Sequence, residues 1–257
     1  MFREFISSSL TIAEMEARKI RHDSTELWTR LVQPALWLLL FGTVFSAIKG
    51  ITQFIGNFTY TQFITPGVLA QSVLFVAIFY GITVVWERDT GILSKLLSTP
   101  SPRSSIIVGK ALSASVRGLF QAVMIFALAL IIGVNLRFDP LDELGVLAVI
   151  VVFAMCVSSL SMILASFLKT RDRMMGIGQA ITMPLFFASN AIYPISLMPS
   201  WLQFISKFNP LSYVVDAVRA MLLTGDYSNL LVDIAVLVAF TVLFLAIASV
   251  TIRRIIE

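Results

Sequence analysis

The chain alternates between long apolar stretches without any ionisable residue and short stretches in which charges gather. Four charge-free stretches have roughly the 20 residues with which one helix crosses a bilayer. Because their apolar positions are continuous rather than alternating, they predict helices and not the strands of a membrane barrel. Two longer stretches each hold one more span plus turn-rich sequence, so we expect an all-α membrane protein with six transmembrane helices. The single spans lie between residues 30–49, 117–137, 143–169 and 233–253, and the longer stretches are 50–86 and 174–206.

The segments between the spans carry patterns of their own. Residues 1–29 have apolar side chains on one helical stripe and polar ones opposite, which predicts an amphipathic helix on the bilayer surface. This helix is either a simple anchor or a relay of motion to the first span. Residues 50–67 are rich in Thr, Asn and Gln, and they predict a short outer loop before the second span.

The charged segment 87–103 contains a short apolar stripe, formed by Ile92, Leu93, Leu96 and Leu97. This spacing predicts a helix of barely two turns, with Asp89 or Thr90 as its N-cap and prolines behind it. So short a helix in a charged loop is expected to have nothing of its own chain to bury against. It therefore either lies on the bilayer or docks onto a partner protein.

A re-entrant outer helical hairpin is expected between spans five and six, over residues 196–224. Asn209 and Pro210 divide this segment into two apolar pieces. At 1.5 Å per residue these pieces cover about 12 Å and about 20 Å, too little for a core of roughly 30 Å. Asp216 and Arg219, three residues apart on the second piece, could neutralise one another.

Composition supports membrane insertion and charge gives the orientation. The chain has 257 residues, 58% of them hydrophobic and 13% charged, against about 25% charged in an average soluble domain. Under the six-span arrangement, 15 of the 19 Lys and Arg residues fall on one side. By the positive-inside rule, both termini and the loops after spans two and four are cytoplasmic, as in a multi-pass protein of the cell membrane. The net charge of +4 follows from this bias and calls for no nucleic-acid partner.

Polar chemistry at membrane depth is sparse. The single histidine is His22, and the single cysteine, Cys156, is expected to be a small core residue. Phosphate-binding, zinc-protease and serine-nucleophile motifs are missing from the sequence. We therefore expect no catalytic, cofactor-binding or metal-binding residue, and no enzyme activity of the chain itself. The third span is expected to begin near Ile106, before its charge-free stretch, so Lys110 and Arg117 fall within its first turns. Lys110 is expected to snorkel to the interface, and Arg117 is a candidate for a charge lining a transport path.

Three stretches together resemble the permeases of type-2 ABC exporters, a group that includes drug, lipid and polysaccharide export permeases. The likeness extends over nearly the whole chain, as a single transmembrane permease domain of residues 1–257. The stretches are Trp86-Glu87-Arg88-Asp89-Thr90-Gly91 with residues 92–100, Ser189-Asn190-Ala191-Ile192-Tyr193-Pro194 with residues 198–202, and Asn209-Pro210-Leu211-Ser212-Tyr213 through Asp216 to Arg219.

The resemblance implies partners and roles for these residues. It implies ATP-binding subunits on a separate chain, which hold the ATP and Mg, and a second permease copy in a homodimer or heterodimer with the path at its interface. It assigns Asn209, Pro210, Tyr213, Asp216 and Arg219 to the re-entrant segment. The residues it implies for coupling to the ATPase are Glu87, Arg88, Asp89, Thr90, Gly91, Ile92, Leu93, Leu96 and Leu97.

The expected substrate is a lipophilic or amphipathic compound, a drug-like molecule or a lipid. Apolar spans with scattered Thr, Ser, Gln and Asn suit a ligand that arrives from the membrane. Export of a polysaccharide or lipid-linked glycan is the alternative. Two further alternatives are a scaffold that tethers an ATPase without transport, and a carrier that needs no ATPase.

Overall fold

The computed structural model describes Thr11, Glu14, Thr29 and residues 31–46, 58–98, 103–168 and 170–251. All regular secondary structure in these residues is helical, which confirms the all-α prediction for the part of the chain they cover. The predicted amphipathic helix of residues 1–29 lies almost entirely outside the described residues.

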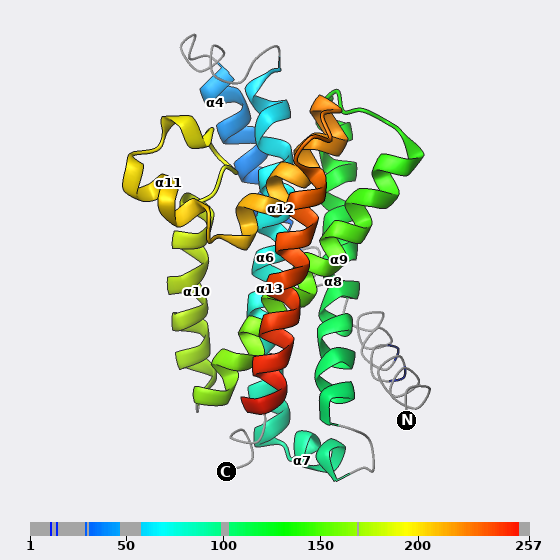
Figure 1. Ribbon diagram of the computed structural model, residues 1–257, viewed down its shortest axis with the longest axis vertical. Helices are drawn as coiled ribbons and strands as arrows, with labels where there is room; N and C mark the ends of the chain where they lie inside the picture. Colours follow the sequence, from blue (N-terminus) through cyan, green and yellow to red (C-terminus); the bar gives the residue numbers. More distant parts are fainter. Residues whose placement is uncertain are drawn as a thin grey trace.

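Figure 1 shows how the described helices follow one another along the chain. The first apolar segment is divided into α3, a π-helical turn η1, and α4, and a second π-helical turn, η3, follows α12. Their bounds are α3 Val32–Leu36, η1 Trp37–Phe41, α4 Gly42–Ser46, α6 Tyr60–Asp89, α7 Ile92–Leu97, α8 Arg103–Ile132, α9 Pro140–Phe167, α10 Arg171–Phe187, η2 Ile195–Leu197, α11 Ser200–Ser206, α12 Pro210–Arg219, η3 Ala220–Thr224 and α13 Leu230–Thr251.

Four of these helices are long and apolar enough to cross a membrane: α6, Ser104–Ile132 of α8, α9 and α13. They correspond to the second, third, fourth and sixth predicted spans. The first predicted span contains the shorter apolar stretch Val32–Phe45, and the fifth contains α10, with 17 residues. Six crossings and the re-entrant hairpin therefore stay predictions.

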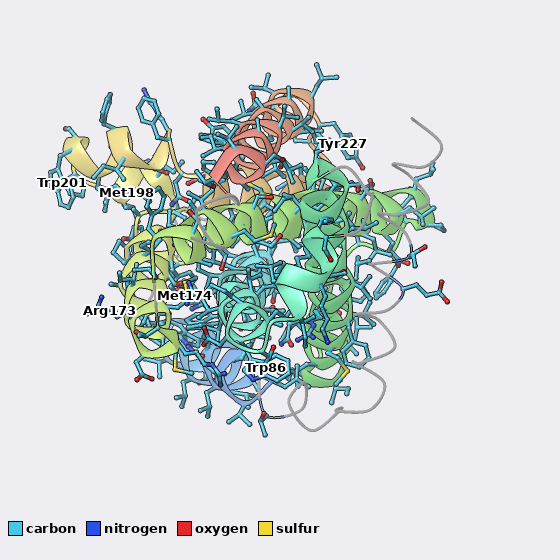
Figure 2. The ribbon with its side chains drawn as sticks, turned by 90° about the horizontal axis from the view of Figure 1, so that it is seen from below. Trp86, Arg173, Met174, Met198, Trp201 and Tyr227 are labelled. Carbon is cyan, nitrogen blue, oxygen red and sulfur yellow. The ribbon has the colours of Figure 1, made fainter. Side chains whose placement is uncertain are left out.

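Helix α9 lies at the centre of the bundle and packs against α6, α8 and α13. In Figure 1 it crosses the bundle obliquely, while α7 lies at the lower end together with the start of α10 and the end of α13. α10 rises from that end to about mid-height, where α11 is set off to one side, and α12 then leads towards the upper end. Figure 2 shows Trp201 of α11 at the edge of the bundle, pointing away from it.

The predicted outer loop of residues 50–67 is wrong for its second half, because α6 already begins at Tyr60. The hydroxyl of Thr59 accepts a hydrogen bond from the backbone N–H of Gln62, and the Gln62 side chain accepts one from the N–H of Thr59 at 2.8 Å. Such a capping box satisfies two donors that a helix start leaves unpaired. Its signal, Thr59-x-x-Gln62, is present in the sequence. Pro66 lies within α6 despite removing one backbone donor.

Small residues let α6 and α9 approach closely. A Cβ on Gly81 would collide with Ser161 of α9, whose hydroxyl accepts a hydrogen bond from the Gly81 N–H at 2.8 Å and donates one to the carbonyl of Ile78. Close approach of backbones through small residues is the usual way in which helices associate in a membrane. Cys156 lies in the same interior and is fully buried, as expected.

Candidate functional site

The turn from α6 into α7, which we call the elbow (residues 86–97), is built by Thr90 and Gly91. The Thr90 hydroxyl donates to the carbonyls of Trp86 at 2.9 Å and Glu87 at 3.3 Å, so it closes α6. Gly91 has φ of +73°, and its carbonyl accepts the N–H of Lys95 at 3.2 Å at the start of α7. The predicted two-turn helix is confirmed. The expected cap at Thr90 is wrong, because its hydroxyl serves the preceding helix.

A buried ion pair fastens the elbow to α8. The ammonium group of Lys110 donates to the carboxylate of Glu87, and both side chains are 1% exposed. The expectation that Lys110 snorkels is therefore wrong: its charge is compensated inside the protein. Glu87 is therefore buried rather than exposed on the elbow surface, and its predicted coupling to the ATPase stays a prediction.

Two further side chains tie the elbow to other helix ends. The guanidinium of Arg88 donates to the carbonyl of Leu168, at the end of α9, over 3.4 Å. Asp89 pairs with Arg88 at 3.3 Å and with Arg171, the first residue of α10, at 3.8 Å. These partly exposed pairs are weak individually. Together with the Lys110 pair, however, they join the elbow to α8, α9 and α10.

The apolar stripe of α7 faces its own chain more than expected. Leu93 is 1% exposed and packs in a cluster with Tyr80, Val84 and Ile107 of the neighbouring helices. The expectation that this helix has nothing of its own chain to bury against is thus wrong at Leu93. Ile92 and Leu96 are half-buried, whereas Lys95 is exposed. The Leu97 side chain lies outside what the structure describes.

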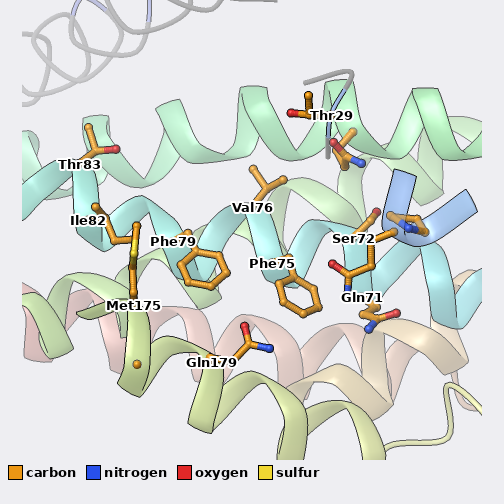
Figure 3. A pocket seen from close by; sticks show the side chains of 14 residues that line it. Thr29, Gln71, Ser72, Phe75, Val76, Phe79, Ile82, Thr83, Met175 and Gln179 are labelled. Atoms are coloured by element: carbon orange, nitrogen blue, oxygen red, sulfur yellow. The ribbon is translucent and has the colours of Figure 1, made fainter. Parts of the chain in front are cut away.

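A groove of about 960 Å³ runs along α6 between α3, α8 and α10 (Figure 3). Its wall combines the rings of Phe75 and Phe79 with neutral polar side chains, and no ionisable residue is among the described residues that line it. The lining residues are Thr29, Gln33, Pro34, Gln71, Ser72, Phe75, Val76, Phe79, Ile82, Thr83, Gln121, Met175, Gly176 and Gln179.

Arg117, the predicted path charge, is not among the residues lining this groove. It lies on α8, half-buried, with its guanidinium carbon 5.9 Å from the centre of the Tyr80 ring. Its role in a path stays a prediction.

Residues 209–219, which were predicted to belong to a re-entrant segment, contribute to a polar cluster at the other end of the bundle from α7. The predicted pair of Asp216 and Arg219 forms, at 3.3 Å. Arg219 also donates to the carbonyl of Asn190 at 2.8 Å and lies 4.1 Å from the centre of the Phe63 ring. The Asn190 amide donates to Asp216. One guanidinium thus joins α12, the turn after α10, and α6.

Asn209 and Tyr213, two other residues of segment 209–219, also form hydrogen bonds. The Asn209 side chain accepts the N–H of Leu211 at 3.0 Å and donates to the carbonyl of Leu185 at 2.6 Å. Pro210 occupies the first position of α12, where its missing N–H costs little. The Tyr213 hydroxyl donates to the carbonyl of Lys207 at 2.6 Å.

Sequence reasoning missed the glutamines of the groove. Gln71 and Gln121 lie in long apolar helices, and a glutamine amide at membrane depth is the signal that could have found them. No group of three or more His, Cys, Asp or Glu among the described residues could hold a metal ion.

Several described helices are long and apolar enough to cross a membrane, and together they are typical of an integral membrane protein. More particularly, the chain belongs to the ABC-2 type transporter family, whose model matches residues 9–223. It is thus the membrane-embedded permease subunit of an ABC transporter.

Several similar proteins are named as permeases. The transport permease ycf38 of Cyanophora paradoxa is 28% identical over 218 residues, which are 84% of this chain and 74% of that protein. The inner membrane transport permease YadH of Escherichia coli K12 is 28% identical over 243 residues, 91% of each chain. The daunorubicin resistance ABC transporter permease protein DrrB1 of Streptomyces coeruleorubidus is 25% identical over 218 residues, 84% of this chain and 75% of that protein.

Proposed function

We propose that this permease is the membrane half of an ATP-driven exporter that moves a lipophilic or amphipathic molecule, drug-like or lipid, out of the cytoplasm or inner leaflet. The observation that carries the proposal is the continuity of α6. Its residues 71–83 form one wall of the groove, and the same helix ends at the elbow. A displacement at the elbow therefore reaches the groove through one rigid element.

The energy comes from a separate ATP-binding subunit, which holds the ATP and Mg; this chain binds no cofactor in our proposal. That subunit docks on the exposed side of α7, around Lys95, and on the partly exposed Arg88 and Asp89. The buried Glu87 and Leu93 hold this surface on the permease. The family description supports the partnership, since ABC transporters couple permeases to ATP-binding proteins.

A second permease copy completes the transporter, as a homodimer or heterodimer, and covers the groove. The path then runs between two such grooves. Both termini and the elbow lie on the cytoplasmic side in this arrangement, because most basic residues fall there.

The groove favours a lipophilic substrate over a glycan. Its aromatic and aliphatic wall suits a molecule that enters from the bilayer. One relative is named for daunorubicin resistance, which is a property of that protein and supports a drug-like substrate here. Export of a polysaccharide or lipid-linked glycan is the second candidate, for which the phenyl rings of the groove would serve as platforms.

The test is reconstitution of the permease with its co-purified ATP-binding subunit in inside-out vesicles. We expect hydrophobic drugs or lipids to stimulate ATP hydrolysis and to accumulate inside the vesicles only when ATP is present. Stimulation by lipid-linked glycans alone would contradict the substrate. ATP hydrolysis without movement of any compound would identify a scaffold, and movement without nucleotide would identify a self-sufficient carrier.

A further inference from the structure

Two glutamines in the groove wall have polar atoms without a hydrogen-bond partner among the described residues. Gln71 lies on α6 and Gln121 on α8, and the residues are 2% and 1% exposed. The atoms concerned are Nε2 of Gln71 and both Nε2 and Oε1 of Gln121. A buried amide without a partner lowers stability, so its place in a cavity wall points to a ligand that supplies the partner.

Two serines on the same helices, Ser72 and Ser113, are satisfied within their own helix. The hydroxyl of Ser72 donates to the carbonyl of Leu69 at 2.7 Å, and that of Ser113 donates to the carbonyl of Gly109 at 2.8 Å. A serine hydroxyl is short enough to return to the preceding turn. The Nε2 atoms of the two glutamines make no such hydrogen bond, and both residues line the groove.

The chemistry of the wall limits what such a ligand carries. A charged group would enter a site where no described lining residue offers a counter-charge, and burying it there would be costly. The amide nitrogens are donors and need an acceptor oxygen, while Oε1 of Gln121 is an acceptor and needs a hydroxyl or amide hydrogen. Phe75, Phe79 and Val76 offer apolar surface beside them (Figure 3).

We propose that Gln71 and Gln121 bind an uncharged polar group of the transported molecule, one that carries both a carbonyl oxygen and a hydroxyl or amide hydrogen. The inference rests on the proposed function and specifies the substrate class as neutral amphiphiles. Because the amide atoms have almost no accessible surface, rotation about the glutamine side-chain torsions brings them to the ligand.

The test compares two probes that share the sphingoid chain and differ at its nitrogen: a short-chain ceramide, in which the nitrogen is acylated to a neutral amide, and sphingosine, in which it is a cationic amine. Equilibrium binding is measured to the complete transporter complex in lipid nanodiscs, without nucleotide. We expect ceramide to bind more tightly. Gln71→Leu or Gln121→Leu should weaken ceramide binding about tenfold, as the loss of one or two hydrogen bonds implies. Gln203→Leu, at a glutamine of α11 that does not line this groove, should change it less than about twofold.

Thermal unfolding of the ligand-free complex is the second measurement. Removal of an unpaired buried amide should leave the unfolding temperature unchanged or raise it. Three outcomes would overturn the inference. Equal ceramide affinity in all variants would mean that the amides hold water only, and tighter binding of sphingosine than of ceramide would contradict the uncharged ligand. A large fall in the unfolding temperature of the glutamine variants would mean that the amides are structural. Because binding is measured without ATP, the binding experiment and the export experiment are independent. A failure of the glutamine proposal can therefore be distinguished from a failure of the proposed export function.

Discussion

At the scale of single residues, Glu87 and Lys110 face one another away from water. Taking two charges out of water costs several kcal/mol each, which their attraction repays only when the pairing is close. The pair therefore adds little net stability. It does, however, prevent the end of α6 from leaving α8, because separation would expose two uncompensated charges to the protein interior.

Replacement of one partner tests this pair. Lys110→Met leaves Glu87 as a buried charge without its cation and should lower the free energy of unfolding by about 3–5 kcal/mol. Arg171→Met removes the exposed partner of Asp89 and should cost less than about 1 kcal/mol. Unfolding of the purified permease in detergent measures both. The exchange Glu87→Lys with Lys110→Glu should recover part of the loss, and a double variant no better than either single change would show that the two charges do not act on each other.

At the scale of elements, the elbow depends on the left-handed backbone conformation of Gly91, which only glycine adopts freely. A Cβ at Gly91 would meet no atom within 4 Å, so Gly91→Ala introduces backbone strain alone, about 1–2 kcal/mol. We expect the transporter assembled with this variant to hydrolyse ATP on its ATP-binding subunit while moving less substrate per ATP, because the direction of α7 changes. Gly133→Ala is the matched control, since Gly133 has φ of +87°, equally open surroundings and a place after α8, far along the chain from the elbow. Equal losses of coupling in both variants would contradict a special role of the elbow.

The two faces of α7 should respond differently to substitution. Leu93→Asp places a carboxylate in the apolar cluster of α6 and α8, so it should lower the unfolding temperature of the permease itself. Lys95→Glu changes an exposed charge and should leave this temperature unchanged while reducing co-purification of the ATP-binding subunit. Full co-purification and full export with Lys95→Glu would place the docking surface elsewhere.

At the scale of the whole molecule, the direction of insertion follows from where basic residues gather. In a Cys156→Ala background, single cysteines at Ser98 and Thr170 should resist an impermeant thiol reagent applied to intact cells, whereas one at Ser200 should react. Ser98 lies at the end of α7 and Thr170 caps α10 at the same end of the bundle, while Ser200 begins α11. Permeabilised cells provide the control, in which all three should react. Labelling of the cysteine at position 98 from outside would contradict this topology.

The sequence by itself determined the features that depend on neighbouring residues. Continuous apolar runs specify helices of membrane length, and four of the spans they predict are matched by long apolar helices. The short stripe of Ile92 and Leu96 specified α7, and the spacing of Asp216 and Arg219 specified their ion pair. In each case the information lies within a few turns of one helix, where hydropathy and spacing fix the geometry.

Only the tertiary structure decided the features that depend on two helices at once. Lys110 has its partner 23 residues away on another helix, so nothing in its own segment distinguishes snorkelling from burial. Leu93 is covered because α6 and α8 meet beside it, and the groove with Gln71 and Gln121 exists only where α3, α6, α8 and α10 come together. The physical reason is that the free energy of a buried charge, leucine or amide depends on what the packed neighbours supply, and a linear pattern does not contain the placement of those neighbours.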